Sequence, residues 1–244
     1  MKAGGILLQL EDLSVARGDS IVISRLTLSI AGPGWFGLVG ANGSGKTTLL
    51  RAIAGRLPHT SGKIILNGED FTYDRAARAA HIGFAVEPGM LPGELSPREI
   101  FALADPRPDA WNHSALAKMG EALNIASLLD TRCRALSAGN LQRVAIYTAF
   151  LGLPRIVILD EPFNWLDPVV TADLKDALRL LIDSEQVQLI SALHDLATLT
   201  TRCDSSALLA EGRLVREFDQ TELRTAQSDP LSFEREIAAY LRSS

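Results

Sequence analysis

The feature that most constrains this chain is the segment GANGSGKT at residues 40–47, which matches the phosphate-binding pattern G-x-x-x-x-G-K-[ST] throughout. The apolar segment WFGLV at 35–39 precedes it, and TLLRAIAG at 48–55 follows with helical character. A glycine-rich turn that matches by chance is the alternative, but it would not explain the strand before the loop and the helix after it. The sequence therefore predicts a loop that joins a buried strand to a helix and binds phosphates.

Each residue type in this loop has a physical task. Glycines let successive backbone N–H groups turn inward around an anion, and the helix that follows points its positive end at the same place. Lys46 is placed to reach the β- and γ-phosphates of a nucleotide, and the Thr47 hydroxyl is a ligand type that suits Mg²⁺. The predicted nucleotide-binding residues of the loop are Gly40, Asn42, Gly43, Ser44, Gly45, Lys46, Thr47 and Thr48.

Composition excludes several classes of protein. The chain has 244 residues, of which 47% are hydrophobic and 22% charged, as is usual for a soluble globular protein. Its net charge of −5 gives no reason to expect nucleic-acid binding. Cys133 and Cys203 are far apart and lack C-x-x-C spacing, so we expect free thiols in a reducing compartment. No segment resembles a signal peptide, and the longest apolar stretch, 144–153, is shorter than the ~18 residues of a membrane span.

Strand and helix patterns alternate along the chain, which predicts the α/β class. The expected strands are 6–10, 13–17, 21–23, 26–30, 35–39, 63–66, 81–86, 155–159 and 187–193, with a closing hairpin at 207–215. The strands before residue 32 form an antiparallel flank in this interpretation. Residues 96–129 are mostly helical and begin with a capping box and Pro97, 171–183 form a helix, and the tail from 221 is helical and charged.

A pair of carboxylates, Asp160-Glu161, ends the apolar run at 155–159. A run of this kind is typical of a central parallel strand, and its end is where ligands bind in α/β sheets. We expect Asp160 to hold Mg²⁺ through water and Glu161 to polarise an attacking water. The alternative is a solvated acidic pair without function, which has less support because a phosphate-binding loop lies upstream.

A second anion site is suggested by LSAGN at 136–140. Ser137 is a good N-cap residue, and the helix that follows it has unpaired N–H groups at its start. Any capped helix would give the same pattern, so this signal alone is weak.

Together these residues resemble the ATP-binding cassette (ABC) ATPases. The resemblance rests on residues 40–48, on 136–140 with Gln142-Arg143, on 156–162 with 164–168, and on His194-Asp195, in the order and spacing of that family. It spans about residues 6–217. The resemblance implies an ATPase that binds ATP and Mg²⁺ between two head-to-tail subunits, in a homodimer or a heterodimer with a second ABC ATPase. It assigns catalytic roles to Lys46 at the phosphates, to Glu161 as general base and to His194 as a γ-phosphate sensor. It also assigns magnesium contacts to Thr47, Glu87 and Asp160, and contacts across the dimer to Ser137, Gly139, Asn140 and Asp167.

The same resemblance implies a division of the chain. A P-loop NTPase core with an antiparallel β flank would cover 1–87 and 151–218, an inserted α-helical subdomain 88–150, and a tail 219–244, all within one ABC ATPase domain. Most lone subunits of this kind couple ATP hydrolysis to transport by separate integral membrane subunits. We therefore expect a cytoplasmic protein held at the inner face of the cell membrane by such a partner.

The sequence departs from the family pattern at four places. Glu87 stands where glutamine is usual, and Ala138 and Asn140 replace the commoner glycine and glutamine of the signature. No aromatic residue lies at 15–18 to stack on the adenine base, so Arg17 is the expected substitute. Trp165 replaces a small residue, and either packs across a dimer interface or fills a local hydrophobic gap.

Other functions remain open at this point. A soluble ABC ATPase that acts as an assembly or scaffold factor is the main alternative, and its soluble partners would distinguish it. A P-loop kinase or GTPase of another family has less support, because no N-K-x-D motif occurs and the segment at 136–140 would be unexplained.

Overall fold

A twisted central sheet carries the predicted phosphate-binding loop. The computed structural model describes residues 6–107 and 112–243, so the predicted ranges 1–87, 88–150 and 219–244 extend partly beyond the described residues. The strand order within that part is β10-β9-β3-β8-β7-β6. Neighbouring strands are parallel, except that β10 runs antiparallel to β9. The strands are β3 (Gly34–Val39), β6 (Ile82–Phe84), β7 (Ile156–Asp160), β8 (Gln188–Ala192), β9 (Ser205–Ala210) and β10 (Arg213–Phe218).

Two hydrophobic cores cover the two faces of this sheet. Phe36 and Leu38 of β3 point into one core together with the helix α1 (Lys46–Ile53), whereas Trp35 and Val39 point into the other. Successive side chains of a strand face opposite sides, so this alternation shows that β3 is covered on both. The side chains of residues 156–159 alternate between the two cores in the same way, so the apolar runs at 35–39 and 156–159 follow from burial on both faces, as predicted.

A second sheet forms the antiparallel flank. Its strands β1 (Ile6–Arg17), β2 (Ser20–Ala31), β4 (Ser61–Leu66) and β5 (Glu69–Asp70) lie in the order β2-β1-β4-β5. The prediction of four short strands before residue 32 was wrong, because they form two long ones. Asp12 and Arg25 have φ values of 48° and 47°, and the β1–β2 register shifts beside them. These residues bend the strands as bulges do and do not end them.

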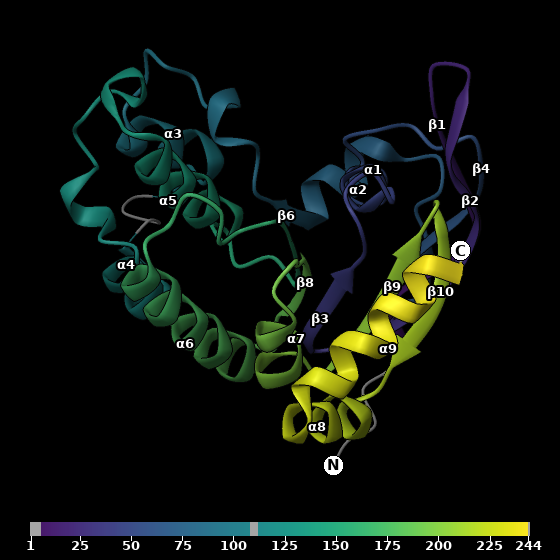
Figure 1. Ribbon diagram of the computed structural model, residues 1–244. Coiled ribbons are helices and arrows are strands. Elements are labelled where there is room, and N and C mark those ends of the chain that lie inside the picture. Colours follow the sequence, from purple (N-terminus) through teal and green to yellow (C-terminus); the bar gives the residue numbers. More distant parts are fainter. Residues whose placement is uncertain (1–5, 108–111, 244) are drawn as a thin grey trace.

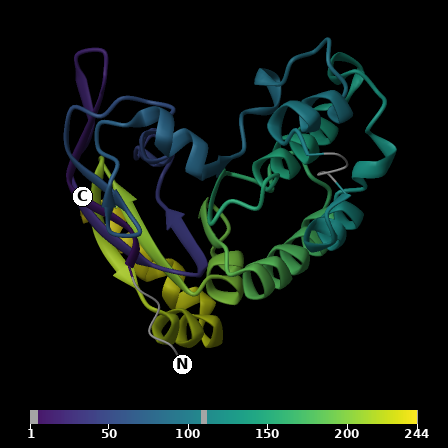
Figure 2. The same ribbon diagram turned by 180° about the vertical axis from the view of Figure 1, so that it is seen from behind.

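A helical arm projects from the core between β6 and β7 (Figures 1 and 2). The chain passes through α2 (Arg75–His81) to β6 and then enters the arm, whose α-helices are α3 (Pro97–Ala104), α4 (Ala117–Ala122) and α5 (Ala138–Ala149), with short 3-10 turns between them. Ser96 and Glu99 form the predicted capping box at α3. The long helix α6 (Pro168–Glu185) contacts both α4 and β3, and so joins the arm to the core.

The remaining helices pack beside the central sheet, and Leu199 of the first of them lies against Gly37 of β3. They are α7 (Leu196–Arg202), α8 (Gln220–Ser228) and α9 (Pro230–Ser243). Phe233 of α9 packs edge-on against Phe218 at the end of β10, with ring centroids 5.3 Å apart. Cys133 and Cys203 are buried and free, as expected. Among the helices of residues 6–107 and 112–243, none combines the length and hydropathy needed to cross a membrane.

Candidate active site

Three parallel strands bring the predicted site residues to one edge of the central sheet. β8 lies between β3 and β7, and its Ala192 is level with Leu38 on one side and with Asp160 on the other. The phosphate-binding loop follows β3, and His194 follows β8. The carboxyl ends of parallel strands are where α/β sheets bind ligands, so residues far apart in sequence meet here.

The loop turns tightly into α1. A Cβ atom added at Gly40 would lie 2.2 Å from the carbonyl oxygen of Leu209, so only glycine fits beside β9. Gly45 has a φ of 106° and is the N-cap of α1, which has no side-chain cap. Capping side chains are present at α2, α3, α5, α6, α7 and α8, whereas α4, which continues directly from a 3-10 turn, has none. The N–H groups at the start of α1 are therefore left for an anion, as the loop sequence predicts.

Lys46 lies inside the loop that it is predicted to serve. Its side chain is buried, and Nζ donates to the carbonyl oxygens of Gly40 at 2.8 Å and Ala41 at 3.1 Å. Burial lowers the pKa of Lys46, while the charges of Glu161 and Asp160 oppose this shift. A phosphate would give this buried cation a partner of opposite charge, which the two carbonyls do not supply.

Asp160 and Thr47 provide oxygen atoms of the kind that Mg²⁺ binds. Asp160 Oδ1 is buried and has no hydrogen-bond partner within the described part of the chain. Burial raises the pKa of Asp160; a hydrogen bond from the Thr47 hydroxyl opposes this, and the charge of Glu161 adds to it. An unsatisfied carboxylate oxygen next to a hydroxyl fits a divalent cation, since bound positive charge would remove the cost of burying this group.

We expect Asp160→Asn to stabilise the nucleotide-free protein at neutral pH. The folded-state pKa lies above the ordinary value of 3.8, so the charged form destabilises the fold at pH values above that folded pKa. The substitution should raise the free energy of unfolding at pH 7 by roughly 0.5–2 kcal/mol, the usual range when a functional site is relieved of such a cost. The gain should shrink as the pH falls through the folded pKa towards 3.8, which urea unfolding at several pH values measures.

Asp130→Asn is the matched control for that substitution. Asp130 is exposed, and its hydrogen bond from Arg98 lowers its pKa, so its charge stabilises the fold at neutral pH. The control should therefore give no gain at pH 7. Destabilisation by Asp160→Asn at pH 7 would show that the buried carboxylate is already well compensated.

Glu161 is held by two neighbours. Its Oε1 atom pairs with His194 Nε2 at 2.5 Å, and its Oε2 atom accepts from Asn164 Nδ2 at 2.7 Å. A carboxylate only accepts, so His194 Nε2 carries a proton in this pair. Glu161 also has a φ of 50°, an unfavourable conformation for this residue type that is often found at functional sites. The strand end, His194 and Asn164 thus fix the predicted general base at the edge of the cavity.

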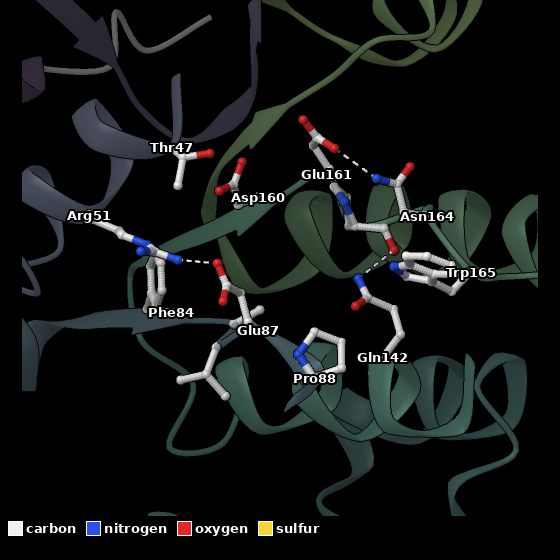
Figure 3. Close-up of a pocket in the computed structure, with 13 residues that line it drawn as sticks. Thr47, Arg51, Phe84, Glu87, Pro88, Gln142, Asp160, Glu161, Asn164 and Trp165 are labelled. Carbon is white, nitrogen blue, oxygen red and sulfur yellow. Dashed lines mark hydrogen bonds and ion pairs between the residues drawn. The ribbon is translucent and has the colours of Figure 1, made fainter. Parts of the chain in front are cut away.

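Two cavities meet beside Glu161. One, of about 440 Å³, is lined by Arg17 and by residues 42, 43 and 45–48 of the loop. The other, of about 230 Å³, runs from Thr47 and Asp160 to the helical arm and is shown in Figure 3. Both are lined by Thr47, Arg51, Glu87 and Glu161. The structure therefore brings Arg17 beside the loop, where sequence analysis expected a substitute for an aromatic residue.

Glu87 lies in this shared region, but its partner is Arg51. The Glu87 carboxylate pairs with the Arg51 guanidinium, and Figure 3 shows the two side chains directed at each other next to Asp160. The expected contact of Glu87 with magnesium is thus compatible with its position but requires its carboxylate to be shared or released.

The signature segment, residues 136–140, is tied to the core by residues that follow it in α5. Ser137 caps α5 by accepting from the Asn140 N–H at 3.3 Å, as predicted. Gln142 Nε2 donates to the Pro162 carbonyl oxygen at 3.0 Å, and Arg143 forms an ion pair with Asp167. Neither of the two cavities is lined by Ser137, Gly139, Asn140 or Asp167 in the described part of the chain.

Trp165 does not fill a local gap, which was one of the two interpretations of its sequence position. Its relative exposure is 73%, and it lies at the rim of the cavity in Figure 3. Its φ of 67° reflects the tight turn between β7 and α6.

Gly139 contacts this turn closely. A Cβ atom added at Gly139 would lie 2.7 Å from the Trp165 carbonyl oxygen. We expect Gly139→Ala to lower the free energy of unfolding by about 1–3 kcal/mol, as overpacking against rigid backbone does. Gly89→Ala is the control, because nothing lies within 4 Å of its added Cβ, and it should stay within about ±0.5 kcal/mol. Equal unfolding midpoints in urea for the two variants would contradict the clash.

Sequence analysis missed Arg51 and Asn164 as members of the site. Arg51 lies one helical turn after Thr47 on α1, so the spacing alone would have placed both on one face. Asn164 lies in the loop after Glu161, and no periodic pattern of the sequence predicts the hydrogen bond that it donates to the Glu161 carboxylate. Both residues act by holding a predicted carboxylate.

Comparison with known proteins adds independent information. The family model described as ABC transporter matches residues 23–164. A sulfate/thiosulfate import ATP-binding protein from Thermosynechococcus vestitus is 30% identical over 91% of this chain and 66% of its own length. A phosphonates import ATP-binding protein from Roseobacter denitrificans is 31% identical over 90% of this chain and 86% of its own length.

Solved structures show the same fold. An ATP-binding subunit of an ABC transporter superposes with a TM-score of 0.80 at 27% identity, covering 93% of this chain and 98% of that one. The chain spans about two thirds or less of the length of several curated relatives, with 66% and 55% for the first two. Similarity therefore covers nearly all of this chain but not all of each relative.

Proposed function

The chain belongs to the family of ABC transporter ATP-binding subunits, and from this membership we propose that it hydrolyses ATP to drive transport by separate membrane subunits. The observation that carries the proposal is the meeting of Lys46, Asp160 and Glu161 at one edge of the central sheet, beside a helix whose start has no capping side chain. This arrangement supports binding of a triphosphate and attack on it by water.

The chain's own residues divide the task. The N–H groups at the start of α1 and the Lys46 ammonium bind the phosphates, and Arg17, which lines the same cavity, would contact the base. Thr47 and Asp160 would hold Mg²⁺, which supplies positive charge next to the phosphate oxygens when it is bound. Glu161 accepts a proton from the attacking water, and His194 positions the Glu161 carboxylate for that step.

Within one chain, residues 136–140 of the signature segment lie outside both cavities, although Gln142, further along α5, lines one of them. Ser137 lies at the start of α5, outside the cavities that Lys46 and Asp160 line. We propose that Ser137 of one subunit contacts the nucleotide bound by the other, so that two head-to-tail subunits enclose two ATP molecules. Trp165, exposed at the cavity rim, would then lie near the second subunit.

We propose that the transport partner is an integral membrane protein, so that the subunit works at the inner face of the membrane. The test is purification of the tagged full-length chain from a detergent extract of its native cells, followed by identification of the proteins that co-purify. Recovery of a polytopic membrane protein is the expected result. Recovery of soluble partners alone would contradict transport and favour an assembly or scaffold role, while leaving ATP hydrolysis in place.

A further inference from the structure

An ion pair crosses the cavity where the nucleotide site meets the helical arm. Arg51 projects from α1, and its Nη2 atom pairs with Oε1 of Glu87. Glu87 is the N-cap of the 3-10 helix Pro88–Met90, with which the chain enters the arm. The Arg51 side chain is 29% exposed and that of Glu87 64%, so the pair lies at the mouth of the cavity.

Arg51 is close to the other groups that would face a cation. It is one helical turn from Thr47, and both residues line both cavities. Figure 3 shows Thr47, Asp160 and the Arg51–Glu87 pair around the same space. The positive charge of Arg51 also acts on Asp160, where it opposes part of the rise in pKa that burial causes.

We propose that Arg51 is a positioning residue that competes with the divalent cation for the Glu87 carboxylate. This inference rests on the proposed function, because it concerns the cation that accompanies the nucleotide. Without the cation, Arg51 holds Glu87; when the cation binds beside Thr47 and Asp160, Glu87 leaves Arg51 and turns to the cation.

The charges explain why the two partners exclude each other. A guanidinium and a divalent cation repel when they share a small cavity, and an ionised carboxylate is the group that each attracts. Arg51 lines both cavities beside Glu87, and its charge acts on Asp160, so a cation at Asp160 adds positive charge beside Arg51. Glutamine at position 87 would be neutral and could not hold Arg51 in this way, which gives a role to the departure from the family pattern.

The test is a double-mutant cycle on cation affinity. The full-length protein is saturated with a non-hydrolysable ATP analogue, and the Kd for Mn²⁺ is measured by electron paramagnetic resonance. Arg51→Gln should tighten Mn²⁺ binding by about fivefold, the scale set by a partly exposed ion pair. Glu87→Gln should weaken it. When Glu87→Gln is already present, adding Arg51→Gln should change the Kd by less than about twofold. Without the Glu87 carboxylate there is nothing to compete for, and only the longer-range repulsion between Arg51 and the cation remains.

Controls separate competition from loss of structure. Arg51→Lys keeps the charge and should stay within about twofold of the wild-type Kd. Arg98→Gln, which removes an exposed ion pair on the helical arm, should leave the Kd unchanged. Weaker Mn²⁺ binding by Arg51→Gln, or an equal effect of Arg51→Gln with and without Glu87, would overturn the inference. Failure of the wild-type protein to bind the analogue would overturn the proposed function itself, and this inference with it.

Discussion

Glu161→Gln should lower the rate of ATP hydrolysis by about 10²–10⁴-fold, the usual contribution of a general base, while ATP still binds. The glutamine side chain keeps the shape of the glutamate and can still accept from Asn164, but it cannot take a proton from water. Single-turnover hydrolysis of ATP with Mg²⁺ measures the chemical step directly. Glu94→Gln is the matched control, because Glu94 is exposed and pairs only with surface arginines in the described structure.

The same variant should change the oligomeric state. If ATP is enclosed between two subunits and hydrolysis separates them, loss of hydrolysis should leave a stable ATP-bound dimer in size-exclusion chromatography. The fluorescence of the exposed side chain of Trp165 provides a second readout. Subtracting the spectrum of the same protein with Trp165→Phe isolates the signal of this tryptophan. A monomer at saturating ATP and Mg²⁺ would contradict the head-to-tail arrangement.

The sequence predicted those parts of the fold that depend on short-range patterns. Apolar runs identified β3 and β7, and the pair Ser96 and Glu99 identified the start of α3, because burial on both faces and helix capping each leave a local trace. The flank was less predictable. Asp12 and Arg25 are charged residues that interrupt the apolar pattern, and only pairing with the neighbouring strand shows that β1 and β2 continue through them.

The site shows the same limit in its side chains. Asp160 and Glu161 were identified because they end an apolar strand, and the structure places them beside the phosphate-binding loop. The pairing of Glu87 with Arg51 could not be predicted, since it depends on how α1 packs next to the chain that enters the arm. A sequence pattern specifies which residue types are present, whereas ion pairs across elements are decided by tertiary packing.

A pairing experiment between two inactive variants tests the enclosed site most directly. Lys46→Ala removes the buried cation that would bind the phosphates and should lower hydrolysis by about 10³-fold, as loss of a preorganised charged donor does. Ser137→Asp should lower it strongly as well, because aspartate still caps α5 but places negative charge where a phosphate would bind. Ser137→Asn, a neutral cap, is the control for the fold of α5.

Mixing these variants distinguishes a shared site from a site within one chain. In a mixed dimer of Lys46→Ala and Ser137→Asp, one site combines an intact Lys46 with an intact Ser137, so random pairing should restore about a quarter of wild-type hydrolysis. Wild type mixed with the double variant should give no intact site in the mixed dimers, because each site then contains one altered residue. If Lys46 and Ser137 of the same chain formed the site, the first mixture would stay inactive and the second would keep one active site per mixed dimer. Recovery in the first mixture therefore requires that two copies of this chain contribute to one nucleotide site.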